Sequence, residues 1–108
     1  MVVKWSDPSK RALRSIFSYY CDVAGRKRAD KLIADIKRFA MRLENSPRMA
    51  AVDPLFERSP RKFRSLVVKK IHKIVYYIDE RDNCVYIADV WDCRQDPKKL
   101  MGRLSDWG

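Results

Sequence analysis

The stretch HKIVYYIDERDNCVYIADVWDCRQDP, from His72 to Pro97, decides the fold because it holds two apolar alternations that meet at a polar turn. HKIVYYID and CVYIADVW are rich in β-branched and aromatic residues, and ERDN between them is typical of a tight turn. Apolar residues at every second position predict strands rather than helices. We therefore predict an antiparallel β-hairpin that stops near Trp91, Arg94 and Pro97.

The period of two begins upstream of this hairpin, at Phe63. FRSLVV predicts a further strand, and Lys69 and Lys70 mark a tight turn that joins it to the hairpin. The preceding segment, RMAAVDPLFERSPRK, is interrupted by Pro54 and Pro60, so we predict a loop there.

The N-terminal half has a helical period instead. VVKWS predicts a short strand, and in the following DPS we expect Asp7 to cap a helix and Pro8 to take its first position. Gly25 separates two apolar sets, and NSP at residues 45–47 ends the second. The sets are Leu13, Ile16, Phe17, Tyr20 and Ala24, then Ala29, Leu32, Ile33, Ile36, Ala40 and Leu43. Because the connection is short, we predict an antiparallel helical hairpin.

The order strand, helix, helix, strand, strand, strand predicts a single α+β domain over residues 1–108, with the helical hairpin on one face of a mainly antiparallel sheet. The face that carries Ile74, Tyr76 and Ile78, or the opposite one, should meet the helices. The other face is then expected to meet solvent or a ligand. DPKKLMGRL predicts a short C-terminal helix with Leu100, Met101 and Leu104 on one side.

Composition indicates a folded, strongly basic protein. The 108 residues include 24 Lys plus Arg and 14 Asp plus Glu, for a formal charge of +10, which favours a polyanionic or acidic partner. Three cysteines without a CxxC pair, together with one histidine, favour free thiols in a reducing cytosol over a metal site, and we expect no cofactor. No signal-peptide core and no 18-residue apolar run is present in the sequence, so we expect a cytoplasmic protein without a membrane partner.

A basic window from Arg58 to Lys73 contains no acidic residue. It is either a solvated edge that discourages aggregation or a surface that binds phosphate or acidic side chains. We expect Arg94, with Lys98, Lys99 and Arg103 of the tail, to lie on a neighbouring element and extend this window. Its members are Arg58, Arg61, Lys62, Arg64, Lys69, Lys70 and Lys73.

His72 is the only histidine and is the first candidate for a proton carrier, although a lone His in a strand is more often a packing residue. Asp89 and Asp92 are most simply ion-pair partners near a sheet edge, with chemistry as the alternative. Tyrosines and Trp91 in the hairpin could stack on bases if they faced outward, but at this spacing at least half should be core. Neither a phosphate-binding Gly loop nor a nucleophile elbow occurs in the sequence.

Several short motifs follow one another in an order that is more specific than any one of them. They are Trp5, Ser6, Asp7 and Pro8 at the first helix; Pro47 after the second; Arg64 with Leu66; HKIVY at 72–76; and Arg94, Asp96 and Pro97 at the end. In this arrangement the chain resembles the RelE/ParE superfamily of toxins from bacterial type II toxin-antitoxin systems. The resemblance covers most of the chain and implies the same α+β fold.

The resemblance implies one of two activities. The RelE-like branch cleaves mRNA on the ribosome through basic groups of the sheet, which would make Arg64, Lys73, Arg94 and His72 the catalytic candidates here. Members commonly have Tyr-Arg where this chain has His72 and Lys73, and the tail LSDWG lacks the C-terminal Tyr or His of many nucleases. The ParE-like branch has no nuclease site and poisons DNA gyrase. The long helical hairpin and the WSDP opening favour this branch.

The resemblance also implies a partner. A cognate antitoxin of this family is usually encoded next to the toxin, wraps an acidic or amphipathic segment around it, and is the part that contacts operator DNA, often in plasmid stabilisation. The window residues and Arg94 would then bind the antitoxin or the target. A basic nucleic-acid-binding module remains an alternative of another class.

Overall fold

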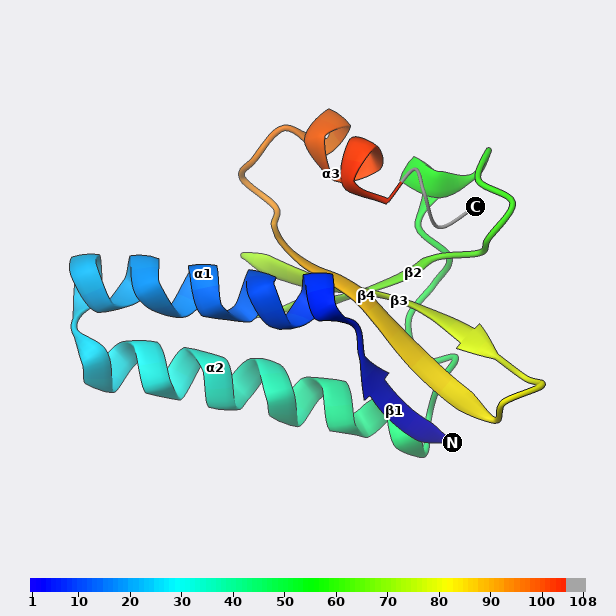
Figure 1. The fold of residues 1–108 in the computed structure, drawn as a ribbon, viewed down its shortest axis with the longest axis horizontal. Coiled ribbons are helices and arrows are strands. Elements are labelled where there is room, and N and C mark those ends of the chain that lie inside the picture. Colours follow the sequence, from blue (N-terminus) through cyan, green and yellow to red (C-terminus); the bar gives the residue numbers. More distant parts are fainter. Residues whose placement is uncertain (105–108) are drawn as a thin grey trace.

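The computed structural model describes residues 1–104, and Figure 1 shows their arrangement. Its elements are β1 (Val2–Trp5), α1 (Asp7–Ala24), α2 (Arg26–Met41), the 3-10 turns η1 (Arg42–Glu44) and η2 (Pro54–Phe56), β2 (Arg64–Val68), β3 (His72–Asp79), β4 (Cys84–Asp92) and α3 (Pro97–Arg103). The predicted α+β fold, with its helical hairpin and short C-terminal helix, is confirmed.

The four strands form one sheet in the order β1, β4, β3, β2. β3 pairs antiparallel with both β4 and β2, as the hairpin predicts, and β1 pairs parallel with β4. The two expected turns are tight because Lys69, Lys70 and Asn83 adopt positive φ angles of 51°, 66° and 51°. The register of β3 on β4 shifts between Val75 and Tyr76, where β4 supplies one additional residue.

The start of α1 differs from the prediction. Ser6 rather than Asp7 is the cap, because its backbone is extended and its Oγ accepts a hydrogen bond from the Ser9 amide at 3.1 Å. Asp7 is the first helical residue, where its charge still favours the helix N-terminus. Gly25, with φ of 89°, ends α1 and directly precedes α2, so the two helices lie antiparallel as predicted.

The helices cover the sheet face that carries Ile74, Tyr76 and Ile78, which was one of the two predicted options. The core there is made of small and branched side chains from α1 and α2 on the strands. Its buried members are Ala12, Leu13, Ile36, Ala40, Leu43, Ala50, Val68, Ile74, Tyr76, Val85, Ile87 and Val90. The Tyr76 hydroxyl, which is fully buried, donates a hydrogen bond to the Pro47 carbonyl at 2.7 Å.

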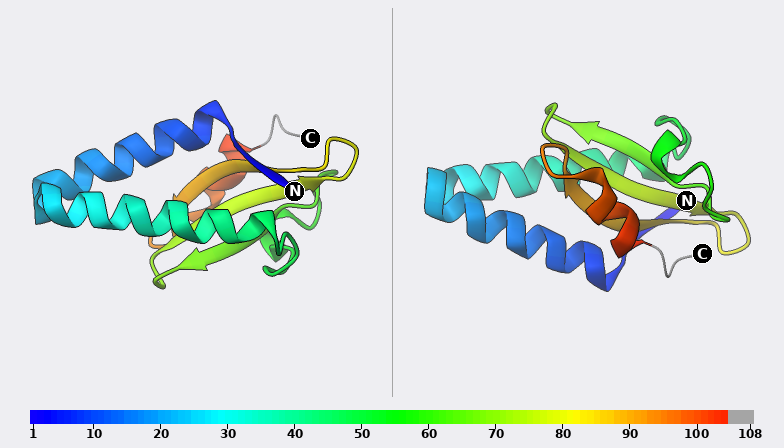
Figure 2. Two further views of the ribbon diagram at one scale, coloured as in Figure 1. Left: turned by 90° about the horizontal axis from the view of Figure 1, so that it is seen from below. Right: turned by 90° about the horizontal axis from the view of Figure 1, so that it is seen from above.

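The expectation that the second sheet face meets solvent or a ligand is wrong. Phe56 and Phe63 from the loop before β2, with Leu100 and Leu104 at the C-terminal end, pack on this face. They cover Val75, Tyr77, Ala88 and Trp91, and Figure 2 shows α3 on the side of the sheet away from the helical hairpin. The loop and α3 therefore act as a third layer, because this face of the strands is too apolar to be left in water.

Candidate functional site: basic surfaces and a helical groove

The basic window does not form one patch. Arg58, Arg61 and Lys62 lie in the loop before β2, whereas Lys69 and Lys70 form the turn after it. Five strand residues separate the two groups, which corresponds to about 17 Å along β2. The guanidinium of Arg61 stacks on the Tyr77 ring, 4.1 Å from its centroid, so this end of the window also supports the second core.

Arg94 lies beside the other end of the window, whereas Arg103 of the tail, which was expected to extend the window too, pairs with Asp89. The Cys93 amide donates to the Ile71 carbonyl at 2.7 Å, which places Arg94 beside the Lys69–Lys70 turn. The exposed guanidinium donates to Asp92 through Nε at 3.0 Å and Nη2 at 2.7 Å, and to the Tyr20 hydroxyl of α1 at 3.4 Å. The hydrogen bonds from Arg94 hold the pKa of Asp92 below its usual range.

Lys73 is held inside the protein. Its Nζ donates to Asp53 Oδ2 at 2.7 Å, and that carboxylate also accepts from Ser65 Oγ at 2.6 Å and from the Leu55 amide at 3.0 Å. Burial by itself would raise the pKa of Asp53, but the hydrogen bonds from Lys73, Ser65 and Leu55 outweigh it and lower the pKa. Lys73 therefore fastens the 48–63 loop to the sheet.

His72 is 2% exposed and packs against the Tyr20 ring at 5.9 Å between centroids. Burial lowers its pKa, and the nearby Asp92 offsets this only in part, so the imidazole is neutral at pH 7. The predicted packing role fits this position. Arg64, half-buried at the far end of β2, donates through Nη1 to the Ala50 carbonyl at 2.7 Å.

The four nuclease candidates do not converge. His72 and Lys73 are neighbours in β3, so their side chains point to opposite faces of the sheet. Arg64 pairs with Tyr76, four residues along β3 from His72, which is about 13 Å. Lys73 contacts the loop, and Arg94 turns back toward α1.

Asp89 lies beyond Ile87, the last residue of β4 that pairs with β1, so its predicted position near a sheet edge and its predicted role in an ion pair are confirmed. The carboxylate is fully buried, and its Oδ1 accepts from the Val90 amide at 2.8 Å and from Arg103 of α3 at 2.6 Å. Desolvation raises its pKa to about 6, although Arg103 and the Val90 amide act in the opposite direction. A cavity of about 500 Å³ beside this pair is lined by Arg11, Ser15 and Asp92 among others.

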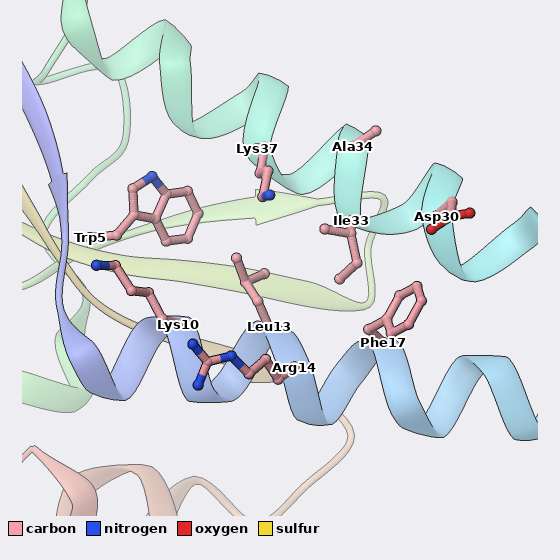
Figure 3. A pocket seen from close by; sticks show the side chains of 9 residues that line it. All are labelled: Trp5, Lys10, Leu13, Arg14, Phe17, Asp30, Ile33, Ala34 and Lys37. Atoms are coloured by element: carbon pink, nitrogen blue, oxygen red, sulfur yellow. The ribbon is translucent and has the colours of Figure 1, made fainter. Parts of the chain in front are cut away.

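A groove of about 860 Å³ lies between α1 and α2, and the sequence analysis did not predict it. Figure 3 shows Leu13, Phe17 and Ile33 pointing into the space between the helices, with Trp5 at one end. The remaining lining is mostly basic: Lys10, Arg14 and Lys37, with Asp30 and Ala34. The sequence signal for this groove was the wide apolar arc of α1, in which Leu13 and Phe17 are four residues apart and so share one helix face.

A helical hairpin packed on a four-stranded sheet, with basic and grooved surfaces outside it, defines the RelE/ParE class of fold. The family model described as the ParE toxin of type II toxin-antitoxin systems, parDE, matches residues 3–97. The chain therefore belongs to the ParE toxin family.

Two solved structures share the fold. One, the chromosomal ParDE toxin-antitoxin system from P. aeruginosa, has a TM-score of 0.71 and 19% identity, covering 85% of this chain and 95% of that one. The other, the toxin-antitoxin complex RelBE2 from Mycobacterium tuberculosis, has a TM-score of 0.62 and 20% identity, covering 84% and 95%. The search of curated proteins gave no significant match. Within residues 1–104, none of the helices is both long and apolar enough to cross a membrane.

Proposed function

We propose that this toxin arrests growth by inhibiting DNA gyrase in the cytoplasm, and that a cognate antitoxin, which also recognises the operator DNA, neutralises it in a plasmid-stabilisation system. The observation that carries the proposal is the match of the ParE toxin model to residues 3–97. The alternative, a ribosome-dependent mRNA endoribonuclease, needs several basic groups around one phosphate. Its candidates here lie on opposite sheet faces and are bound to other protein groups.

The exposed cations at the Lys69–Lys70 turn and Arg94, with Arg58 and Lys62 at the other end of β2, are the candidates for contact with the target or the antitoxin. The groove between α1 and α2 suits an amphipathic segment of the antitoxin. Leu13, Phe17 and Ile33 would receive apolar side chains, and the basic rim would favour acidic ones. Such a segment orders on binding, so apolar anchors are needed to offset its lost entropy.

The test of the target is induction of the toxin without its antitoxin, followed by two measurements on the same culture. We expect plasmid DNA to lose negative supercoiling and the DNA-damage response to be induced, with mRNA intact. The purified toxin should also inhibit supercoiling by gyrase. Cleavage of ribosome-bound mRNA with unchanged supercoiling would overturn the assignment to gyrase.

The antitoxin surface is tested by titrating purified toxin with the antitoxin at 50 and 500 mM salt. We expect a marked loss of affinity at high salt, because the groove rim and the exposed cations attract acidic groups. Phe17→Ser should weaken binding at least 10-fold, whereas Tyr19→Ser, an exposed α1 position outside the groove, should not. Equal affinities of the two variants would remove the groove from the interface.

A further inference from the structure

A row of basic residues follows the exposed side of α2. The row consists of Arg28, Lys31, Arg38 and Arg42, of which Arg42 is the residue just past the end of α2. The intervals between them are three, seven and four residues, which are one or two helical turns. Residues at this spacing occupy one helix face. Lys69 and Lys70 of the β2–β3 turn adjoin the middle of the row. We call these six residues the α2 stripe; all are exposed.

Asp35 is the one acid within the row, and it is already neutralised. Its side chain is 4% exposed, accepts a hydrogen bond from Arg38, and lies 2.5 Å from Lys69 Nζ. The hydrogen bond from Lys69 is the main reason why the pKa of Asp35 is lowered, so the carboxylate stays ionised and holds the turn against α2. Six positive charges against one negative leave the stripe a net charge of +5.

The stripe and the groove are separate surfaces. The groove takes Asp30, Ile33, Ala34 and Lys37 from α2, and none of these is a stripe residue. An antitoxin segment in the groove would therefore leave the α2 residues of the stripe uncovered, while Lys69 and Lys70 are also candidates for contact with the antitoxin or the target. None of the six stripe residues is apolar, and the Arg42 guanidinium covers the Phe39 ring at 4.4 Å. Ile71, which follows the turn, is an exposed apolar side chain next to the stripe.

The contrast between an apolar groove and a charged stripe indicates which kind of partner the stripe binds. A disordered acidic peptide loses entropy on binding and needs buried apolar contacts, which the groove supplies and the stripe does not. Duplex DNA is already ordered, and its non-specific binding requires only cations opposite phosphates. The fourteen steps from Arg28 to Arg42 span about 21 Å of helix. Along the DNA axis, about six phosphates of one strand occupy that length, at about 3.4 Å each.

We propose that the α2 stripe binds the phosphate backbone of duplex DNA without reading its sequence. This goes beyond inhibition of gyrase, and it gives the toxin its own contact with DNA, whether that DNA is an operator already recognised by the antitoxin or a segment near gyrase. Four or five neutralised phosphates predict a slope of log affinity on log salt of about −4.

The experiment measures fluorescence anisotropy of a labelled 20-bp duplex of arbitrary sequence with the purified toxin, between 50 and 200 mM salt. The stripe variant carries Arg28→Gln, Lys31→Gln and Arg42→Gln, which leave the Asp35 contacts intact. The control carries Arg81→Gln, Lys98→Gln and Lys99→Gln, which remove the same charge from other exposed positions. Thermal melting of both variants checks the fold.

We expect the stripe variant to lose at least 10-fold in affinity at 100 mM salt and its slope to fall by about 3. The control should stay within about 3-fold. Equal losses in both variants would mean that net charge alone binds DNA, and this would overturn the assignment to the stripe. Tighter binding to single-stranded RNA of the same length, or a loss confined to the antitoxin, would overturn the choice of partner. Gyrase inhibition is measured separately, so the two proposals fail independently.

Discussion

Asp89→Asn should make the protein more stable at neutral pH, although the substitution removes an ion pair. Asp89 is fully buried in β4, and its carboxylate meets Arg103 of α3, while Asp92 and Arg11 line the cavity next to it. Its pKa is raised to about 6, so burial destabilises the ionised carboxylate by more than the attraction to Arg103 stabilises it. Asn keeps the shape of the side chain and can still accept from the Val90 amide.

The size of the expected gain in the free energy of unfolding follows from proton linkage. The folded chain holds the Asp89 proton more tightly than the unfolded chain, so the stability from this group is fully present below the ordinary pKa of 3.8 and is lost as pH rises through about 6. A shift of about two pK units at about 1.4 kcal/mol each amounts to about 3 kcal/mol of lost stability at pH 7. Asn is neutral throughout and avoids this loss, but it forfeits attraction to Arg103, so a net gain of about 1–3 kcal/mol is expected.

The assay is urea unfolding of both proteins from pH 4 to 7.5, with the difference between them as the readout. The difference isolates Asp89, because His72, whose pKa is lowered by burial, contributes with the opposite sign: its stability is lost as pH falls below the ordinary value of 6.5. The gain from Asn should grow between pH 4 and 6.5 and then level off. A variant less stable than the parent at pH 7.5, or a difference independent of pH, would show that the Arg103 pair outweighs desolvation.

Three further outcomes follow from single contacts. Tyr76→Phe should cost about 1 kcal/mol in urea unfolding, because the half-buried Pro47 carbonyl loses the donor that the buried Tyr76 hydroxyl supplies. The exposed Tyr19→Phe should cost nothing measurable, and equal costs would contradict this. His72→Gln should leave growth arrest within a few-fold in a plating assay, and a loss above about 10²-fold would instead indicate acid-base catalysis. Arg94→Ala should abolish growth arrest with little change in melting temperature, since the ion pair of Arg94 with Asp92 is exposed. Arg81→Ala, at another exposed position, serves as the control. A fully toxic Arg94→Ala variant would show that the active surface lies elsewhere.

The helices, strands and turns could be predicted from the sequence because local patterns determine them. The two alternations after His72, the Lys69–Lys70 turn and the break at Gly25 all act within a few residues. The cap of α1 was placed one residue late because Ser6 and Asp7 are both good caps, and only the backbone geometry distinguishes them.

The binding surfaces were harder to predict from sequence, because they depend on which distant segments come into contact. The window from Arg58 to Lys73 is continuous in sequence, but β2 separates its two exposed groups. Arg64 and Lys73, the last residue of the window, are half-buried. The partner of Lys73 is Asp53, twenty positions away across two prolines, and no local pattern predicts that contact. The second core was missed for the same reason, since Phe56 and Leu100 come from opposite sides of the sheet-forming sequence.

The net basic charge of the sequence indicates a polyanionic partner, but several of the basic side chains form ion pairs within the protein. Three carboxylates with low exposure, Asp35, Asp53 and Asp89, each join an element to a distant one through Lys69, Lys73 and Arg103. Removing one of these cations leaves a poorly solvated carboxylate without its pair, so a loss of toxicity in such a variant would report on folding as much as on binding. Arg28, Lys31, Lys70 and Arg94 do not have this double role. Within residues 1–104 the first three form no ion pair, and Arg94 pairs with Asp92 at the surface. Substitutions at these exposed cations therefore separate the surface that binds from the charges that hold the fold.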